Sequence, residues 1–170
     1  MDRINIIVAV TRENAIGRGG DQLAYISEDL RRFKALTEGH TVIMGRKTNL
    51  ALPKRKLAKR RNIVVTRQDG FEVPEGVEIA HSPAEALRMS VGDGEIFVIG
   101  GGEIYRVMMR EASRLYVTHI EMSVEGADTY FPEIGPEWEK TWESEQREDE
   151  KSGLGYRFAE YERREEAEEK

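Results

Sequence analysis

The segment TVIMGRKT, residues 41–48, contains the pattern from which the fold class can be inferred. Its first four residues form a short apolar, mostly β-branched run, which predicts a strand buried on both faces. Gly45 then provides a turn, and Arg46-Lys47-Thr48 opens a predicted helix. A strand followed by a glycine turn and a helix directs free backbone N–H groups at a phosphate.

The same order occurs a second time further along the chain. The predicted strand EIFVI, Glu95–Ile99, runs into Gly100-Gly101-Gly102, and helical character follows from Glu103 to about Glu111. Two more helices are predicted, one capped by Ser27 with Leu30, Phe33 and Leu36 at helical spacing, the other from Ala84 to about Ser90 behind the capping box Ser82-Pro83-Ala84-Glu85. Other short apolar runs predict strands at residues 4–10, 62–66, 77–80 and 115–120.

Alternating strands and helices predict a three-layer α/β fold, with a central, mostly parallel sheet and helices on both faces. Residues 138–145 and 156–161 alternate in polarity and predict an antiparallel hairpin at the C-terminal edge. We expect one domain over residues 1–163 and a charged tail over residues 164–170. Between Thr11 and Ile26 no period is visible while Gly17, Gly19 and Gly20 occur, so an irregular, moving loop is expected there.

Composition limits the classes of function. The 170 residues include no cysteine, which excludes disulfides and thiolate chemistry, and a net charge of −6 disfavours duplex nucleic acid as the main partner. No apolar stretch is long enough for a membrane span and no signal peptide is visible, so we expect a cytoplasmic protein, monomeric and without a membrane partner. One basic cluster stands out, Lys54 to Arg61, which is either a solvated loop or a local site for an anion.

Ligands of open α/β sheets gather at the carboxyl ends of strands, which points to the residues after Val10, Met44, Val65 and Ile99. Basic or hydroxyl side chains follow two of these strands, namely Arg46, Lys47, Thr66 and Arg67. Such residues suit a ligand with several phosphates, as in a dinucleotide. Alternatively, the glycines are simple turn residues and the arginines are solvated.

Asp29 is a single acid on an otherwise apolar helix face, which it shares with Phe33 and Leu36. It either complements the helix dipole or lies in a pocket. In a pocket, desolvation would raise the pKa of its carboxyl while the helix N-terminus opposed that rise, and the carboxylate could pair with a cationic or amidine-like group. The three histidines show no metal-ligand spacing, and no metal site is predicted.

Taken together, these residues resemble the dihydrofolate reductase family from Ile4 to about Tyr161. The resemblance rests on several motifs in the family's order. They are Ala15-Ile16-Gly17, Glu28-Asp29-Leu30 with Phe33-Lys34, Val42–Thr48, Arg60–Ile63, Val98–Tyr105, Thr118–Ile120 and Asp128–Pro132.

The resemblance implies hydride transfer from NADPH to C6 of dihydrofolate. It makes Asp29 the partner of the pterin 2-amino group and N3, supported by the Thr118 hydroxyl, with Tyr105 also in the catalytic set. Arg60 would take the α-carboxylate of the substrate's glutamate. The wall of the pterin and benzoyl pocket would comprise Ile7, Val8, Leu30, Phe33, Leu52, Leu57, Ile99 and Tyr105.

For the cofactor, the resemblance implies that Arg46, Thr66 and Arg67 face the 2′-phosphate. The pyrophosphate would approach Lys47, Thr48 and the turn Gly100-Gly101-Gly102, which in the family contains a cis peptide between its first two glycines. The remaining cofactor contacts implied are Ala9, Ile16, Gly17, Gly45, Glu103, Tyr105 and Thr129.

The chain departs from the family pattern before Asp29, where Gln22-Leu23-Ala24 and then Tyr25 replace the usual Leu-Pro-Trp. Asn49 stands where an aromatic residue is common, and Ala58-Lys59 replaces Pro-Gly. Two alternatives stay open: a reductase of pteridine or riboflavin-type precursors with the same fold, and a cofactor-binding module without turnover.

Overall fold

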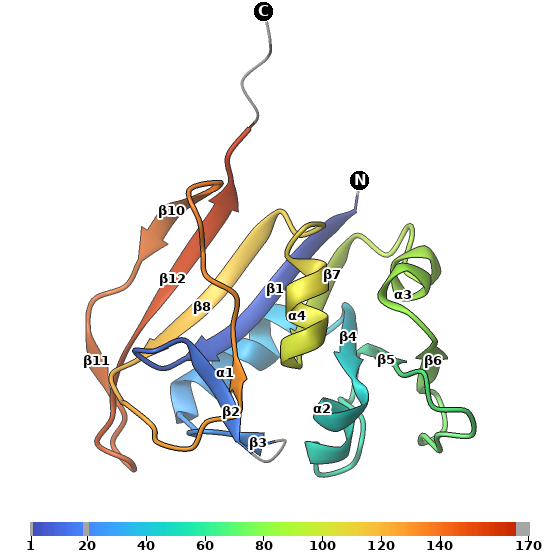
Figure 1. The fold of residues 1–170 in the computed structure, drawn as a ribbon, viewed down its shortest axis with the longest axis horizontal. Coiled ribbons are helices and arrows are strands. Elements are labelled where there is room, and N and C mark those ends of the chain that lie inside the picture. Colours follow the sequence, from blue (N-terminus) through green and yellow to red (C-terminus); the bar gives the residue numbers. More distant parts are fainter. Residues whose placement is uncertain (1, 19–20, 166–170) are drawn as a thin grey trace, which may run out of the picture.

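A computed structural model describes residues 2–18 and 21–165, and within these residues a mixed sheet forms the centre of the molecule (Figure 1). Its strand order is β10-β12-β8-β1-β7-β4-β5-β6, and β11 pairs with β12. The strands are β1 (Arg3–Val10), β4 (Thr41–Gly45), β5 (Arg61–Val65), β6 (Glu78–Ala80), β7 (Glu95–Gly100), β8 (Arg114–Ile120), β10 (Trp138–Glu143), β11 (Arg147–Glu148) and β12 (Gly155–Arg163).

Strands β8, β1, β7, β4, β5 and β6 run parallel, while β12 is antiparallel to β8 and both β10 and β11 are antiparallel to β12. The predicted parallel sheet with an antiparallel C-terminal edge is therefore confirmed. The central strands have apolar residues on both faces, since helices cover both.

Helices pack on the two faces of the sheet and make the predicted three layers (Figure 1). On one face, α3 (Pro83–Met89) and α4 (Gly102–Met108) bury Ala86 and Met108 against strand residues such as Ile6. On the other face, α1 (Ser27–Thr37) packs Leu36 in the cluster of Val42 and Phe97. Helix α2 (Arg46–Ala51) follows β4 directly, as the glycine turn predicts.

Two helix starts test the capping predictions. Ser82 caps α3 as expected, since its Oγ accepts a hydrogen bond from the N–H of Glu85 at 3.0 Å. The prediction that Ser27 caps α1 is wrong: Ile26 is the N-cap residue, without a side-chain cap, and Ser27 is already helical. The Ser27 N–H instead donates to Asp149 Oδ1 at 3.2 Å, so a carboxylate distant in the sequence supplies the missing acceptor.

The segment 11–26 is also more regular than predicted. It contains β2 (Ala15–Arg18) and β3 (Asp21–Gln22), which form a small sheet with β9 (Thr129–Tyr130) in the order β3-β2-β9. Strands this short carry no detectable period, and the partner β9 lies more than 100 residues away in the sequence. Gly19 and Gly20, on which the prediction of an irregular loop partly depends, lie outside the described residues.

Candidate active site

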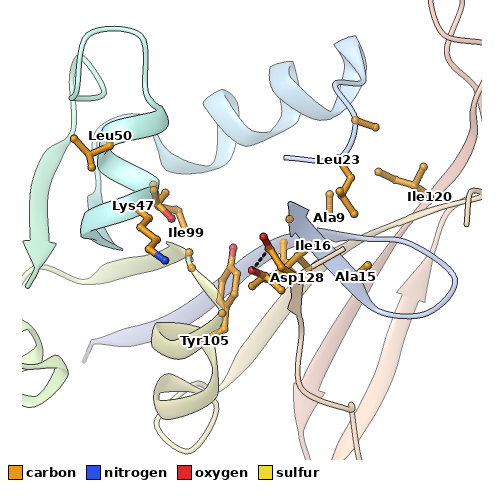
Figure 2. A pocket seen from close by; sticks show the side chains of 18 of the residues that line it. Ala9, Ala15, Ile16, Leu23, Lys47, Leu50, Ile99, Tyr105, Ile120 and Asp128 are labelled. Atoms are coloured by element: carbon orange, nitrogen blue, oxygen red, sulfur yellow. Dashed lines mark hydrogen bonds between the residues drawn. The ribbon is translucent and has the colours of Figure 1, made fainter. Parts of the chain in front are cut away.

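A cavity of about 680 Å³ opens at the carboxyl ends of β1, β4 and β7, where the sheet topology predicts a ligand (Figure 2). Residues from both glycine turns and from the β2–β9 sheet face it. Its lining is Val8, Ala9, Ala15, Ile16, Gly17, Leu23, Ala24, Arg46, Lys47, Thr48, Leu50, Ile99, Gly100, Gly101, Gly102, Tyr105, Ile120, Asp128 and Thr129.

The turn between β7 and α4 is packed so closely that side chains are excluded. A Cβ at Gly100 would lie 2.9 Å from Thr48 Oγ1, and Gly100 has a φ of +141°. A Cβ at Gly102 would lie 2.6 Å from Thr129 Cγ2. The peptide between Gly100 and Gly101 is cis, as the resemblance implies. Backbone therefore forms this wall of the cavity, beside the start of α2.

The predicted phosphate-binding side chains lie at two places around the cavity. Arg46 and Lys47 line it, whereas Thr66 and Arg67 follow β5 outside the lining. Thr66 is buried and its Oγ1 accepts a hydrogen bond from the N–H of Gln68 at 3.0 Å. The Arg67 guanidinium is exposed and lies 3.9 Å from a carboxylate oxygen of Glu103.

Asp29 lies in the first turn of α1, half-buried, and accepts a hydrogen bond from Thr118 Oγ1 at 2.5 Å. Burial raises the pKa of this carboxyl, while the Thr118 hydrogen bond and the charge of Arg32 oppose the rise. Thr118 is the neighbour of Ala9 across β8 and β1, which places this pair beside the cavity wall. The carboxylate itself is not part of the cavity lining.

Tyr105 links the cavity to the central strand. Its ring is buried, and its hydroxyl donates to the carbonyl oxygen of Ile7 at 2.8 Å (the ring stands at the centre of Figure 2). Burial raises the pKa of this phenol and the negative charge of Asp29 adds to the effect, so the hydroxyl keeps its proton. The side chain therefore acts here as a fixed hydrogen-bond donor.

The predicted apolar substrate wall is assembled only in part. Ile7, Leu52, Leu57 and Ile99 belong to one apolar cluster on the α1 face of the sheet, and of these only Ile99 also lines the cavity. Val8 lines the cavity from β1. Phe33 is half-buried on α1, and Leu30 is 45% exposed. An exposed leucine one residue from Asp29 is an apolar surface open to a ligand.

Arg60 lies on the loop before β5, where it donates to Thr37 Oγ1 at 3.0 Å and to the carbonyl oxygen of Ala58 at 2.9 Å. Partial burial lowers the pKa of its guanidinium, and Glu38 opposes this shift. Two other members of the basic cluster are paired within the chain: Lys59 lies 3.7 Å from Glu38, and Arg61 pairs with both Glu78 and Asp93 at 2.7 Å. Within the described residues, Arg60 makes hydrogen bonds to Thr37 and Ala58 but no ion pair with a carboxylate.

Comparisons with known proteins agree with this geometry. A sequence model of the family described as dihydrofolate reductase matches residues 3–163. The chain is 40% identical over 162 residues to a dihydrofolate reductase of Neisseria gonorrhoeae, covering 95% of this chain and 98% of that protein. It is 37% identical over 162 residues to one of Staphylococcus haemolyticus, covering 95% and 96%.

The chain belongs to the dihydrofolate reductase family. Its fold also resembles that of dihydrofolate reductase from Enterococcus faecalis, solved in complex with NADP(H) and RAB-propyl, with a TM-score of 0.88 and 30% identity. That likeness covers 96% of this chain and 97% of the other.

In this member of the dihydrofolate reductase family, several residues that line the cavity were not predicted as site residues from the sequence. They are Ala15, Leu23, Ala24, Leu50, Ile120 and Asp128. The apolar ones carry no sequence signal that separates a cavity position from a core position. The 47% exposure of Leu50 on its short helix, for example, is visible only in the structure. Asp128 directly precedes the predicted Thr129, which donates to it at 2.8 Å (Figure 2).

The departure from the dihydrofolate reductase pattern before α1 changes which side chains line the cavity. Ala24, in the place of the family's tryptophan, lines the cavity, whereas Tyr25 is 55% exposed and lies outside the lining. Near α2, Asn49 is buried and donates to the carbonyl oxygen of Arg55 at 2.6 Å, so a polar side chain fills the position where an aromatic residue is common.

Proposed function

We propose that this chain is an NADPH-dependent dihydrofolate reductase that converts 7,8-dihydrofolate to 5,6,7,8-tetrahydrofolate. The observation that carries the proposal is the half-buried Asp29 carboxylate, bonded to Thr118 beside a cavity with two glycine turns. The family assignment and the NADP(H) complex of the Enterococcus faecalis relative support the choice of cofactor.

The cavity fits a dinucleotide. Its backbone wall has no room for a Cβ atom at Gly100 or Gly102, so main-chain N–H groups of this turn can approach a pyrophosphate closely. Lys47 and Thr48 would complete this site, and Arg46, Thr66 and Arg67 would hold the 2′-phosphate. The remaining cofactor contacts proposed are Ala9, Ile16, Gly17, Gly45, Glu103, Tyr105 and Thr129. When bound, NADPH supplies the hydride from C4 of its nicotinamide.

Asp29 would recognise the pterin. A carboxylate that accepts one hydrogen bond from Thr118 still has free lone pairs, which can accept from the 2-amino group and N3 of the substrate. Its negative charge in a partly desolvated place favours the protonated pterin, because the Coulomb attraction is weakly screened there. Water admitted to the site would protonate N5, while Asp29 stabilises the positive charge.

Other side chains would orient the substrate and exclude water. The apolar wall proposed for the pterin and benzoyl rings consists of Ile7, Val8, Leu30, Phe33, Leu52, Leu57 and Ile99. Arg60 would bind the α-carboxylate of the glutamate. The Tyr105 hydroxyl fixes α4 to β1 through the Ile7 carbonyl, which holds the turn at Gly100 against the cavity. Orientation of two bound reactants accounts for much of the rate acceleration in such enzymes.

Dihydrofolate-dependent oxidation of NADPH, followed by absorbance at 340 nm, tests the proposal. We expect turnover by the wild-type chain and a loss of about 100-fold or more for Asp29→Asn at neutral pH. Partial recovery of this variant is expected in acid, where the substrate is protonated by solvent. The variant Asp69→Asn, in the loop after β5, is the matched control and should keep full activity. Tight NADPH binding without any turnover would contradict the proposal.

The proposal extends to the form and location of the enzyme. We infer a single domain over residues 1–163 that works as a monomer in the cytoplasm on small-molecule substrates. In the described residues no helix is long and apolar enough to span a membrane, and no group of His, Asp or Glu is arranged to hold a metal ion. Sedimentation at micromolar concentration checks the oligomeric state, and a stable dimer would contradict it.

A further inference from the structure

Glu103 places a negative charge where the nucleotide phosphate is expected. It lies in the first turn of α4, directly after Gly102 of the cavity lining, and its carboxylate oxygen is 3.9 Å from Arg67 Nη2. The side chain of Arg67 is 92% exposed and that of Glu103 is 76% exposed. Neither is held in place by packing, so an incoming anion can reach Arg67 and displace Glu103.

The pair combines two opposite means of cofactor recognition. In dinucleotide sites an arginine accommodates the 2′-phosphate of NADP, whereas an acidic side chain hydrogen-bonds the ribose 2′-hydroxyl of NAD. A carboxylate beside the guanidinium competes with the phosphate for the same N–H donors. A ligand without the 2′-phosphate does not meet this competition.

We propose that Glu103 is a specificity-determining residue, which weakens recognition of the 2′-phosphate by Arg67 and thereby reduces the preference for NADPH over NADH. The inference rests on the proposed function for the position of the nucleotide.

Nucleotide binding tests the inference without any need for turnover. The probes are adenosine 2′,5′-bisphosphate and its partner without the 2′-phosphate, adenosine 5′-phosphate, titrated calorimetrically into the full-length protein at low salt. Glu103→Gln should tighten binding of the 2′,5′-bisphosphate about two- to fivefold, the range expected for one exposed charge pair. Binding of the 5′-phosphate should stay unchanged or weaken.

Two further variants make the test specific. Glu111→Gln removes the same charge from an exposed position beyond the end of α4 and should alter neither affinity. In an Arg67→Gln background, the added Glu103→Gln change should have no effect on the 2′,5′-bisphosphate, because the inference assigns the whole effect to that guanidinium.

The outcomes separate the inference from the proposed function. Equal tightening of both nucleotides by Glu103→Gln, no tightening of either, or a gain that persists without Arg67 would each overturn the specificity role while leaving a nucleotide site in place. If the wild-type chain binds neither probe, and NADPH as well fails to bind, the proposed function fails together with the inference.

With NADPH and NADH as substrates, the same variant gives a second readout. We expect Glu103→Gln to lower the KM for NADPH about two- to fivefold with little change in kcat, and to leave the KM for NADH unchanged or raise it. A change confined to kcat would contradict a role in binding the 2′-phosphate.

Discussion

At the scale of single residues, Asp29 is held in a place that is unfavourable for its charge. Burial raises the pKa of its carboxyl, and only one hydrogen bond, from Thr118, and the charge of Arg32 oppose this. Arg32 is itself occupied, since it pairs with Glu160 at 3.0 Å and stacks 4.5 Å from the centroid of the Phe158 ring. The stability lost by holding this carboxylate on α1 is compatible with a role in binding.

The first prediction concerns stability. In the unfolded chain the Asp29 carboxyl ionises at its ordinary pKa, whereas in the folded chain it ionises at higher pH. Above both pKa values the charged group costs folding free energy, and below both it costs none. Asp29→Asn should therefore raise Tm at pH 7, by roughly 2–4 °C for ~1 kcal/mol.

Thermal unfolding followed by circular dichroism between pH 3 and pH 8 measures this gain. It should shrink as the pH falls through the folded pKa towards the ordinary value. Asp69→Asn controls for the general effect of removing one charge. A stability loss for Asp29→Asn at pH 7 would show that the carboxylate is favourably placed after all.

The second prediction concerns Thr118. Its hydrogen bond holds the pKa of the Asp29 carboxyl down, so Thr118→Val should raise that pKa further. The acid limb of the pH–rate profile should then shift to higher pH, with about a tenfold loss of kcat on that limb, equivalent to ~1.4 kcal/mol. Thr141→Val on the exposed strand β10 is the matched control. An unshifted profile would remove the bond from the mechanism.

Single residues were predictable where their chemistry conflicts with their surroundings. Asp29 was singled out as an acid on an apolar face, and the glycine turns were singled out by their place after strands. Leu23, Ala24 and Leu50 were not, because an apolar residue on a loop or short helix looks the same whether it faces a cavity or the core. The roles of Asp29, Arg60 and the cofactor contacts stay predictions until ligands are bound.

At the scale of elements, the loop of residues 52–60 is held by two buried asparagines. Asn62 Oδ1 accepts from the N–H of Leu57 at 2.9 Å, and its amide donates to the carbonyl oxygens of Leu57 and Arg60, each at 2.9 Å. Asn49 holds the same loop through Arg55. The loop carries the proposed substrate contacts Leu57 and Arg60, so these asparagines fix the position of both.

The third prediction follows from the hydrogen bonds that Asn62 makes to this loop. Asn62→Ala leaves three backbone groups unsatisfied and should cost about 2–3 kcal/mol of stability, read from urea denaturation. Because Leu57 and Arg60 move with the loop, the KM for dihydrofolate should rise several-fold while NADPH affinity is unchanged. Ser90→Ala, another buried polar residue at the end of α3, controls for destabilisation alone. Parallel losses of both affinities would argue against a local effect.

Elements whose signals are local were predicted well. The parallel strands coincide with short apolar runs rich in β-branched residues, and α3 begins at the predicted capping box. Strands β2, β3 and β9 were not predicted, because each has only two to four residues, and β9 pairs with a strand more than 100 residues away in the chain. The predicted cap of α1 was wrong for a related reason, because the acceptor for the Ser27 N–H is Asp149, which is distant in the chain.

At the scale of the whole molecule, the net charge of −6 opposes the binding of a polyanionic cofactor, and local cations must overcome it. Arg46 and Lys47 line the cavity and Arg67 stands exposed beside it. The order of elements in the chain brings these cations together, because β4, β5 and β7 run parallel and end at the same edge of the sheet. Predicting the fold class was therefore enough to predict where the cations meet.

The fourth prediction concerns this electrostatic arrangement. Arg67→Gln should weaken NADPH binding by about tenfold, the value of ~1.4 kcal/mol expected for a charge-assisted contact, and should leave NADH nearly unaffected. The loss should diminish as NaCl is raised from 20 to 500 mM, since salt screens exposed charges. Fluorescence titration of both nucleotides measures it. Equal losses for NADPH and NADH would show that the 2′-phosphate binds elsewhere.

In the proposed mechanism, the cavity brings the nicotinamide of NADPH to a pterin that Asp29 holds. The decisive experiment is mass spectrometry of the product after a single turnover with NADPH dideuterated at C4. We predict tetrahydrofolate with one deuterium at C6, formed fast by the wild-type chain and about 100-fold more slowly by Asp29→Asn at pH 7. Oxidation of the labelled NADPH with no deuterium in the folate, or equal rates for the two chains, would contradict it.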